Sequence, residues 1–109
     1  MRIISGSKKS LSIIAPKNLP SRPTTDKVKE SLFNILINRL QIDEIRVLDL
    51  FAGTGNISFE FASRGAKKII SIDNNLRCIK FIKEISLKHG FTFEFASRGA
   101  KKIISIDNN

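Results

Sequence analysis

The stretch VLDLFAGTGN, from Val47 to Asn56, combines a strand, a glycine turn and the start of a helix. The apolar and β-favouring run from Ile45 to Leu50 is typical of a buried parallel strand. Gly53 and Gly55 then allow the backbone to turn sharply and to lie close to a ligand where a Cβ would collide. The residues that follow predict a helix over about 56–64, ended by a glycine.

The same order of elements continues after this helix. The run KIISID predicts a second buried strand that ends at Asp73. Asn74 or Asn75 can cap a further helix, which Gly90 would end. The apolar face of that helix would carry Leu76, Ile79, Ile82 and Ile85. Strands alternating with helices indicate an α/β fold, in which right-handed crossovers connect the strands of a parallel sheet.

Before this unit, the sequence predicts a hairpin, a linker and a helix. RIISG and LSIIAP are separated by SKKS, a pattern that favours two short strands around a polar turn. PKNLPSRPTT is rich in proline and predicts an extended linker. An amphipathic helix should follow, with Thr25 as its cap and Asp26 in its first turn. Its apolar spacing is given by Val28, Leu32, Ile35, Leu36 and Leu40.

The stretch FEFASRGAKKIISIDNN occurs twice, over 59–75 and again over 93–109. Two copies are too few for a solenoid, which needs about three or more stacked units. The duplication is natural, engineered or an error of assembly, and the sequence leaves these alternatives open. Asp107 repeats Asp73, but no glycine loop precedes the second copy, so we expect no second cofactor site.

The second copy is predicted to differ in structure from the first. Only three residues separate it from the preceding helix, so a helix there would be too short to be stable. FTFEFA instead alternates apolar and polar residues with the period of a strand. We therefore expect a strand over Phe91–Phe95, a turn at Arg98–Gly99 and a further strand over Ile103–Ile106.

Composition limits the class of protein. The 109 residues suit a single domain, and one cysteine, Cys78, excludes an internal disulfide framework. The apolar runs are too short for a signal peptide or a membrane span, so we expect a cytoplasmic protein with no membrane partner. Cys78 fits a packed helix position better than a chemical role.

The charge distribution indicates a polyanionic partner. The chain carries 19 basic and 10 acidic residues, and the net charge is +9. Residues 1–30 contribute +5, residues 31–75 contribute 0 and residues 76–109 contribute +4, so the excess lies at the two ends. Such a surface suits nucleic acid, and lysines that serve only solubility are the alternative.

Three nucleotide-binding motifs can be compared at the glycine loop. A dinucleotide site requires G-x-G-x-x-G/A, and Ser58 stands at the third glycine position. A P-loop requires G-K-[ST], whereas Asn56 follows Gly55. Asp49 and Asp73, at the ends of neighbouring strands, instead suit a cofactor with an amino group and a ribose diol. S-adenosylmethionine is such a cofactor.

Three blocks together resemble the bacterial 16S rRNA guanine-N2 methyltransferase family: MRIISG, RPTTDKVKESLFNIL and VLDLFAGTGNISFEFASRGA. The resemblance covers residues 1 to about 90, roughly the first half of a family member. It implies a partial Rossmann-like methyltransferase sheet with a β-hairpin before it, and methylation of a guanine amine in small-subunit rRNA. The chain would be one truncated domain, with a hairpin and linker over 1–21, a cofactor-binding half over 22–90 and the repeated segment over 91–109.

The resemblance also implies roles for individual residues. The pocket for S-adenosylmethionine would be formed by Asp49, Phe51, Gly53, Gly55 and Asp73, with Asp73 holding the ribose. Arg22 and Thr24 would face the substrate. The implied partner is rRNA or the assembling small ribosomal subunit. From the positive charge of the chain, we expect salt-sensitive, sequence-blind contacts to it through Arg2, Lys8, Lys9 and Arg22. No metal ligands are expected.

Simpler roles remain open for some of these residues. Asp49 could cap the turn that follows it, and Phe51 could pack in the core. His89, next to the glycine that ends its helix, fits a C-terminal cap better than a base.

The sequence departs from the family at the catalytic step. The family places Asn or Asp before Pro-Pro and an aromatic residue, and these 109 residues contain no Pro-Pro pair. SKKS also replaces the family's GR in the expected hairpin. We therefore assign no catalytic residue and expect this chain to be inactive. The alternatives are a non-catalytic fragment that binds S-adenosylmethionine or RNA, and a duplicated chain without a role of its own. We also expect self-association through the open edge of the first strand.

Overall fold

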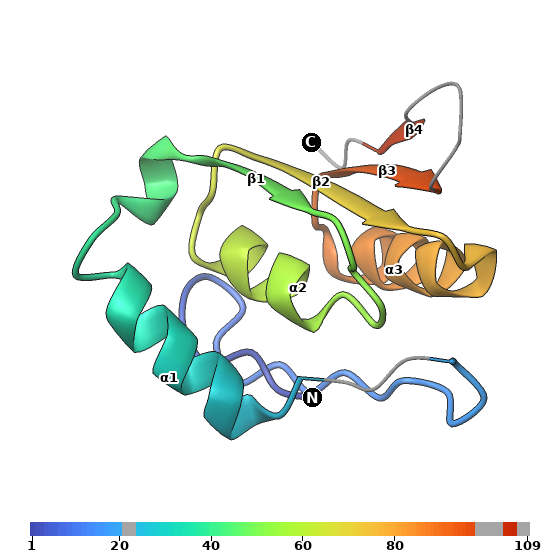
Figure 1. Ribbon diagram of the computed structural model, residues 1–109, viewed down its shortest axis with the longest axis horizontal. Helices are drawn as coiled ribbons and strands as arrows, with labels where there is room; N and C mark the ends of the chain where they lie inside the picture. The colour runs from blue at the N-terminus through green and yellow to red at the C-terminus, as the bar shows by residue number, and fades with distance from the viewer. Residues whose placement is uncertain (21–23, 98–103, 107–109) are drawn as a thin grey trace.

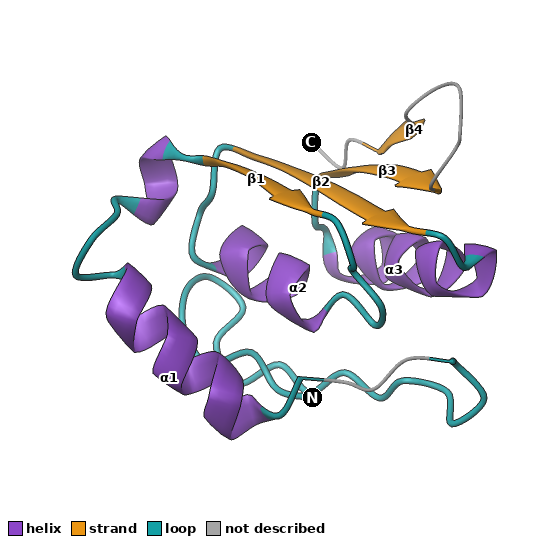
Figure 2. Ribbon diagram, viewed as in Figure 1, coloured by secondary structure: helices purple, strands orange, loops and turns teal. Residues whose placement is uncertain are grey.

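The computed structural model describes residues 1–20, 24–97 and 104–106 (Figures 1 and 2). In chain order the helices and strands are α1 (Asp26–Leu36), a short 3-10 helix η1 (Ile42–Glu44), β1 (Arg46–Asp49), α2 (Asn56–Ser63), β2 (Lys68–Asp73), α3 (Leu76–His89), β3 (Phe93–Ser97) and β4 (Ile104–Ile106). The strands predicted to end at Leu50 and at Asp73 and the three predicted helices are present, each within a few residues of its expected bounds.

The four strands form one sheet in the order β1-β2-β3-β4. β1, β2 and β3 are parallel, and β4 pairs antiparallel with β3. Figure 1 shows α2 and α3 on the same face of this sheet, with α1 and the N-terminal segment beyond α2. Because β1 and β2 are parallel, their carboxyl ends lie at the same edge of the sheet, as the predicted α/β fold requires.

The predicted N-terminal hairpin is not present as a pair of strands. A single antiparallel bridge joins Arg2 to Ser12. The N–H of Ile3 donates to the carbonyl of Leu11, and the N–H of Ile13 donates to the carbonyl of Met1. The N–H of Ser10 also donates to the carbonyl of Ile3 at 2.9 Å. The N–H groups of the following residues, Ile4 and Ser5, donate to the carboxylate of Glu60.

Helix α1 begins as predicted, since the Thr25 hydroxyl accepts a hydrogen bond from the N–H of Val28 at 3.2 Å. Its buried face, however, is not the predicted one. Lys29 and Phe33 are completely buried, whereas Val28 and Ile35 are 57% and 56% exposed. Most of the predicted stripe is therefore exposed, whereas Leu36 is partly buried against the core and Leu40 lies beyond the end of the helix.

The repeated stretch adopts two conformations, as predicted. FEFAS is the body of α2 in the first copy and the whole of β3 in the second. Residues 59–61 are all buried in α2, because this helix lies between the sheet on one side and α1 with the N-terminal segment on the other (Figure 1). In β3 only Phe93 and Phe95 are buried, which is the alternation of a strand covered on one face.

The two copies also pack against each other. The rings of Phe59 and Phe93, equivalent positions of the repeat, stack with their centroids 5.4 Å apart. Phe91 joins this cluster 5.2 Å from Phe59. The predicted strand thus begins two residues later than expected, at Phe93, because Phe91 is used as core before the strand starts. The predicted turn at Arg98–Gly99 lies outside the described residues.

Candidate cofactor site

The glycine loop follows β1 and leads directly into α2. Gly53 and Gly55 have φ values of 56° and 84°, in the left-handed region that favours glycine. A Cβ on Gly55 would lie 2.8 Å from the ring of Phe59 and 2.9 Å from Ile82. Gly55 is therefore required both by its backbone conformation and by the close approach of two core side chains.

Asp73 ends β2 and holds this loop in place. Its Oδ2 accepts a hydrogen bond from the N–H of Gly53 at 2.9 Å, and its Oδ1 accepts one from the N–H of Asn75 at 2.9 Å. A carboxylate offers about four acceptor positions, so each oxygen of Asp73 can accept a further hydrogen bond. The side chain can hold the loop and accept from a ligand at the same time.

Asp49 ends the neighbouring strand β1 and is bound to a buried pair of hydroxyl groups. The Ser58 Oγ donates to Asp49 Oδ2 at 2.7 Å, and the Ser71 Oγ donates to Ser58 Oγ at 2.7 Å. Both serines are fully buried. Sequence reasoning considered Ser58 only as a departure from the dinucleotide motif, although a hydroxyl at this position, one helical turn into α2, can reach the end of β1.

Burial raises the pKa of the Asp49 carboxyl group above its usual value, and the negative charge of Asp73 raises it further. Hydrogen bonds from Ser58 and from the N–H of Phe51 oppose this rise in the pKa. The bond to Phe51 shows that Asp49 does hold the following turn, which was the simpler role open to it. The two carboxylates are thus close enough to affect each other at one end of the sheet.

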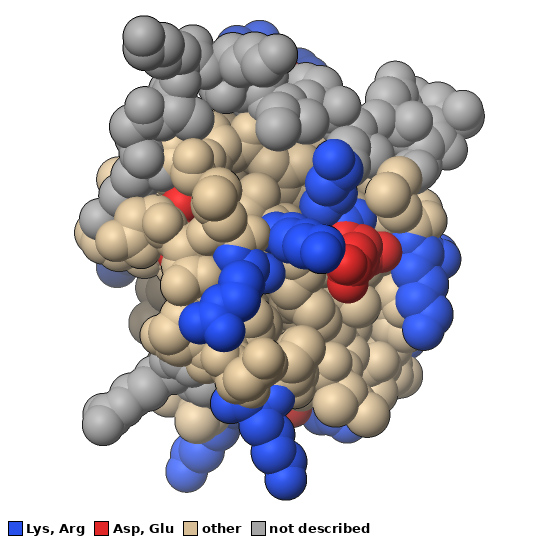
Figure 3. All heavy atoms as spheres, turned by 90° about the vertical axis from the view of Figure 1, so that its right-hand side faces the viewer, with Lys and Arg blue, Asp and Glu red and all other residues tan. Residues whose placement is uncertain are grey.

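Exposed apolar side chains follow the ends of both strands in the sequence, Phe51 after β1 and Leu76 after β2. Phe51 is 74% exposed, so the alternative that it packs in the core is wrong. Leu76, predicted on the buried face of α3, is 69% exposed, because it is the first residue after the Asn75 cap and lies at the open end of β2. The rest of α3 packs as expected, and Cys78 is buried within it. Figure 3 shows this end of the molecule, where lysine and arginine side chains predominate over acidic ones.

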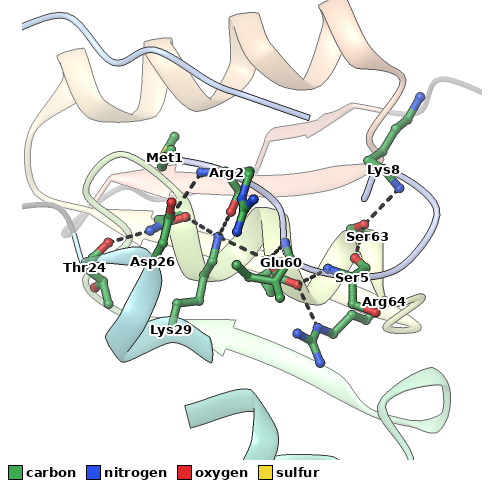
Figure 4. Close-up of polar contacts among 12 residues, drawn as sticks. Met1, Arg2, Ser5, Lys8, Thr24, Asp26, Lys29, Glu60, Ser63 and Arg64 are labelled. Atoms are coloured by element: carbon green, nitrogen blue, oxygen red, sulfur yellow. Dashed lines mark hydrogen bonds and ion pairs between the residues drawn. The ribbon is translucent and has the colours of Figure 1, made fainter. Parts of the chain in front are cut away.

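Thr24, predicted on the substrate side, is connected to the loop through Asn56. The Asn56 Nδ2 donates to the carbonyl oxygen of Thr24 at 2.6 Å, and its Oδ1 accepts from Lys29 Nζ at 2.7 Å (Figure 4). Because Asn56 is the first residue of α2, it fixes Thr24 relative to the glycine loop. Arg22 lies outside the described residues.

A buried ion network lies behind this connection, and sequence reasoning missed it. Lys29 Nζ is 3.1 Å from Glu60 Oε1, and it also donates to the carbonyl of Arg2 at 2.6 Å (Figure 4). Glu60 accepts further bonds from the N–H groups of Ile4 and Ser5 and from Arg64 Nε. Only the i,i+4 spacing of Glu60 and Arg64 could have been recognised from the sequence.

The pKa of the Glu60 carboxyl group is lowered although its burial acts to raise it. The hydrogen bonds from Ile4, Arg64 and Lys29 and the positive charge of Lys29 outweigh the burial. Glu60 is therefore ionised and joins the N-terminal segment, α1 and α2.

The turn that contains Gly6, at the end of MRIISG, packs against the last residue of α2, Ser63. Gly6 has a φ of 95°, and a Cβ there would lie 1.9 Å from the carbonyl oxygen of Ser63. The N–H of Ser7 donates to that carbonyl at 2.7 Å, and the N–H of Lys8 donates to Ser63 Oγ at 3.0 Å. This motif thus has a structural role in the described chain.

The predicted RNA contacts do not gather at one place. The N-terminal segment runs along α2, with Arg2 near its first turns and Lys8 at its last residue, Ser63. Lys8 therefore lies at the opposite end of the sheet from the glycine loop. Lys9 is exposed next to it. His89 is the last residue of α3, as expected for a residue near a C-terminal cap.

No three His, Cys, Asp or Glu side chains in the described part of the chain group together as metal ligands would. No described helix has the length and apolar character that crossing a membrane requires.

The chain matches a family model and several known proteins. Residues 1–92 match the family model described as conserved hypothetical protein 95. YlbH of Bacillus subtilis (strain 168) is 47% identical over 83 residues, which are 76% of this chain and 44% of that protein. Ribosomal RNA small subunit methyltransferase D of Buchnera aphidicola subsp. Baizongia pistaciae is 38% identical over 94 residues, and the match covers 84% of this chain and 46% of the relative.

A solved structure shows the same arrangement of elements. The structure of yhhF from Escherichia coli superposes with a TM-score of 0.69 at 29% identity, and the match covers 89% of this chain and 50% of that one. The chain thus spans about half the length of the relatives that it matches. It belongs to the conserved hypothetical protein 95 family, a Rossmann-like family of ribosomal RNA methyltransferases, and corresponds to the N-terminal portion of its members.

Proposed function

We propose that residues 22–90 are the S-adenosylmethionine-binding half of an enzyme that methylates the exocyclic amine of a guanine in small-subunit rRNA. The observation that carries this proposal is the meeting of Asp49 and Asp73 at one glycine loop. The carboxyl ends of neighbouring parallel strands are where open α/β sheets bind their ligands. The relative from Buchnera is named as a methyltransferase of small-subunit ribosomal RNA, which supports the substrate class.

The residues at the loop fit this cofactor. Asp73 retains acceptor positions for the two hydroxyl groups of a ribose. Asp49, partly buried and negatively charged, suits the amino group and the sulfonium of S-adenosylmethionine, which are both cationic. Phe51 and Leu76 offer exposed apolar surface beside the carboxylates, where an adenine ring would be removed from water.

Each residue would act by binding and orienting. S-adenosylmethionine supplies a methyl group on a sulfonium, which the lone pair of a guanine amine attacks. Gly53 and Gly55 keep the loop backbone close to the ligand, and the Ser58 hydroxyl fixes the orientation of the Asp49 carboxylate. Asn56 fixes Thr24 next to this loop, on the side where the RNA base would approach.

No residue of this chain is proposed to hold the guanine base itself. Positioning of the amine contributes several kcal/mol to such a reaction, and the 109 residues contain no Pro-Pro pair of the kind that the family uses for it. This observation favours a second candidate function, a fragment that binds cofactor or RNA without turnover. Labelled S-adenosylmethionine and small-subunit RNA distinguish the two, because the second predicts no incorporated label.

Calorimetry with S-adenosylmethionine tests the cofactor site. We expect Asp73→Ala to weaken binding about tenfold or more, as the loss of hydrogen bonds to a ligand would. Gly53→Val should remove binding, because valine does not tolerate a φ of 56°. Glu84→Ala, on the exposed face of α3, is the matched control and should bind like the original chain. Equal heats for all four proteins would contradict the site.

The proposed partners are rRNA and a second copy of the chain. Within the described residues β1 pairs only with β2, so its other edge is a template for a further strand. The edge is shorter than expected, at four residues, and Leu48 on it is 56% exposed. Light scattering over a wide range of protein concentration tests this proposal. A constant monomer mass would contradict it, and Leu48→Lys should shift any dimer towards monomer.

A further inference from the structure

A cavity lies at the opposite end of the sheet from the glycine loop. Its volume is about 570 Å³, within the usual range of ligand pockets, roughly 300–1,000 Å³. The N-terminal turn, the segment after α2 and the segment between α3 and β3 enclose it. Both copies of the repeat contribute, because Ala66 to Ile69 belong to the first copy while Phe93 and Glu94 belong to the second.

The polar lining of this cavity is positively charged. Lys8, Lys67 and Lys68 line it, and Glu94 is the one acidic residue among the described residues of the lining, where it pairs with Lys68 at 3.1 Å. The pKa of His89 also reflects the positive charge of Lys8. Burial of His89 lowers its pKa, and the charges of Lys88 and Lys8 lower that pKa further. Three lysines therefore approach one cavity and a single carboxylate offsets them.

The floor of the cavity is apolar, and its rim is polar. Ile69, Phe91 and Phe93 are buried beneath it, and Ser7 and Thr92 add polar atoms at its edge. An apolar floor with a basic rim suits a nucleotide unit, in which a base and sugar adjoin a negatively charged phosphate.

We propose that this cavity is a second RNA-binding site, which takes a phosphodiester unit of the same strand whose base is presented at the glycine loop. The proposal rests on the proposed function for the identity of the ligand. It gives a role to Lys8, which the fold places far from the cofactor loop, and to Lys67 and Lys68, which the motifs did not single out.

The path between the two sites follows the N-terminal segment. Arg2 lies near the first turns of α2 and Lys8 at its end, and eight helical residues span about 12 Å at roughly 1.5 Å per residue. Figure 1 shows the N-terminal segment running beside α2 over this length. An RNA backbone of a few nucleotides covers such a distance, so one strand can contact both ends of the helix.

The first experiment compares two double variants of equal charge. Lys8→Gln with Lys67→Gln removes two cavity lysines, and Lys80→Gln with Lys83→Gln removes two exposed lysines of α3. Affinity for a fluorescent single-stranded RNA is measured over a range of salt concentration. The cavity variant should bind roughly tenfold more weakly at low salt, and its salt slope should fall by about 0.7 for each lost phosphate contact. The control should change far less. Equal losses at every salt concentration would overturn the proposal, because only net charge would then matter.

The second experiment uses the unaltered chain. Lysines are acetylated with and without RNA, and the modified positions are read by mass spectrometry. RNA should protect Lys8, Lys67 and Lys68 and leave Lys80 and Lys83 reactive. Lysines that serve only solubility would be acetylated equally in both samples, and that result would overturn the proposal.

S-adenosylmethionine binding separates this proposal from the first. Calorimetry on the Lys8→Gln, Lys67→Gln variant should give the cofactor affinity of the original chain, because the cavity is at the other end of the sheet. If RNA did not protect Lys8, Lys67 and Lys68 from acetylation while the chain still bound S-adenosylmethionine, only the second site would be overturned. Protected lysines without any cofactor binding would overturn only the cofactor site.

Discussion

Glu60 and Glu94 occupy the same position in the two identical stretches, yet they lie in opposite environments. The Glu60 side chain is 0% exposed and pairs with Lys29, which is also 0% exposed. The Glu94 side chain is 25% exposed and pairs with Lys68, which is 46% exposed. Because the two copies are identical from Phe59 and from Phe93 onward, the difference in environment comes from the residues before each copy and from tertiary structure.

This pair gives a matched test of the buried network. Glu60→Gln should lower the free energy of unfolding by about 3–5 kcal/mol, because it leaves the Lys29 charge buried without its partner. Glu94→Gln should cost about 0–1 kcal/mol, as expected for a pair at the surface. Urea unfolding followed by circular dichroism measures both values. Equal losses would show that Glu60 is not held in a buried ion network.

The same network predicts a loss of stability in acid. The folded-state pKa of Glu60 lies below the usual value of 4.5, so the folded state binds its proton less readily than the unfolded state does. The contribution of Glu60 is complete above the usual glutamate pKa and is lost as the pH falls through the lower, folded-state pKa. Unfolding free energies measured across this range should fall more steeply for the original chain than for Glu60→Gln. Parallel curves for the two proteins would contradict the prediction.

Asp49 should behave in the opposite sense. Its pKa is raised by burial and by Asp73, so its ionised form opposes folding at neutral pH. Asp49→Asn should leave the free energy of unfolding unchanged or raise it, because the neutral amide avoids the burial of a charge. The same variant should bind S-adenosylmethionine more weakly, because it lacks the negative charge. Thermal unfolding and calorimetry check the two effects, and a destabilised variant with normal binding would contradict both.

Gly6 provides a test of the N-terminal lock. Gly6→Ala would place a Cβ 1.9 Å from the Ser63 carbonyl oxygen, so the turn must move away from α2. Gly90→Ala is the matched control, since its φ is also positive, at 76°, and nothing lies within 4 Å of its Cβ. The control should cost about 1–2 kcal/mol for its left-handed backbone alone. Gly6→Ala should cost more, and similar losses in chemical denaturation would show that the turn is free to adapt.

Much of the fold could be predicted because its signals are local. The strand that ends at Asp73, the turn at Gly53 and Gly55 and the cap at Thr25 each depend on residues close in sequence. The expectation that Asp49 and Asp73 lie at one end of the sheet needed only the rule that parallel strands point the same way.

The rest depended on contacts between distant segments. The periodicity of α1 predicted that its aliphatic stripe would be buried, but Lys29 is buried instead because Glu60 and the carbonyl of Arg2 satisfy its charge. The partners lie 31 and 27 residues from Lys29 along the chain, so no local pattern shows them. The same distant residue affects the expected hairpin, since the carboxylate of Glu60 accepts the N–H of Ser5, the next that would face a partner strand after Ile3.

The last prediction uses one substitution at both copies of the repeat. Ala62 lies in α2 and Ala96 is its equivalent in β3, where it pairs with Ile72 of β2. Threonine is less favourable than alanine in a helix by up to about 0.7 kcal/mol, and Ala62 also packs against the core, so Ala62→Thr should destabilise the chain. Threonine is favoured in strands, and Ala96 is only partly buried, so Ala96→Thr should be neutral or stabilise by up to about 1 kcal/mol. Urea unfolding of the two variants should therefore give changes in free energy of different sign or clearly different size. If both variants lost the same stability, FEFAS would have one conformation in both copies, and its division into a helix and a strand would be wrong.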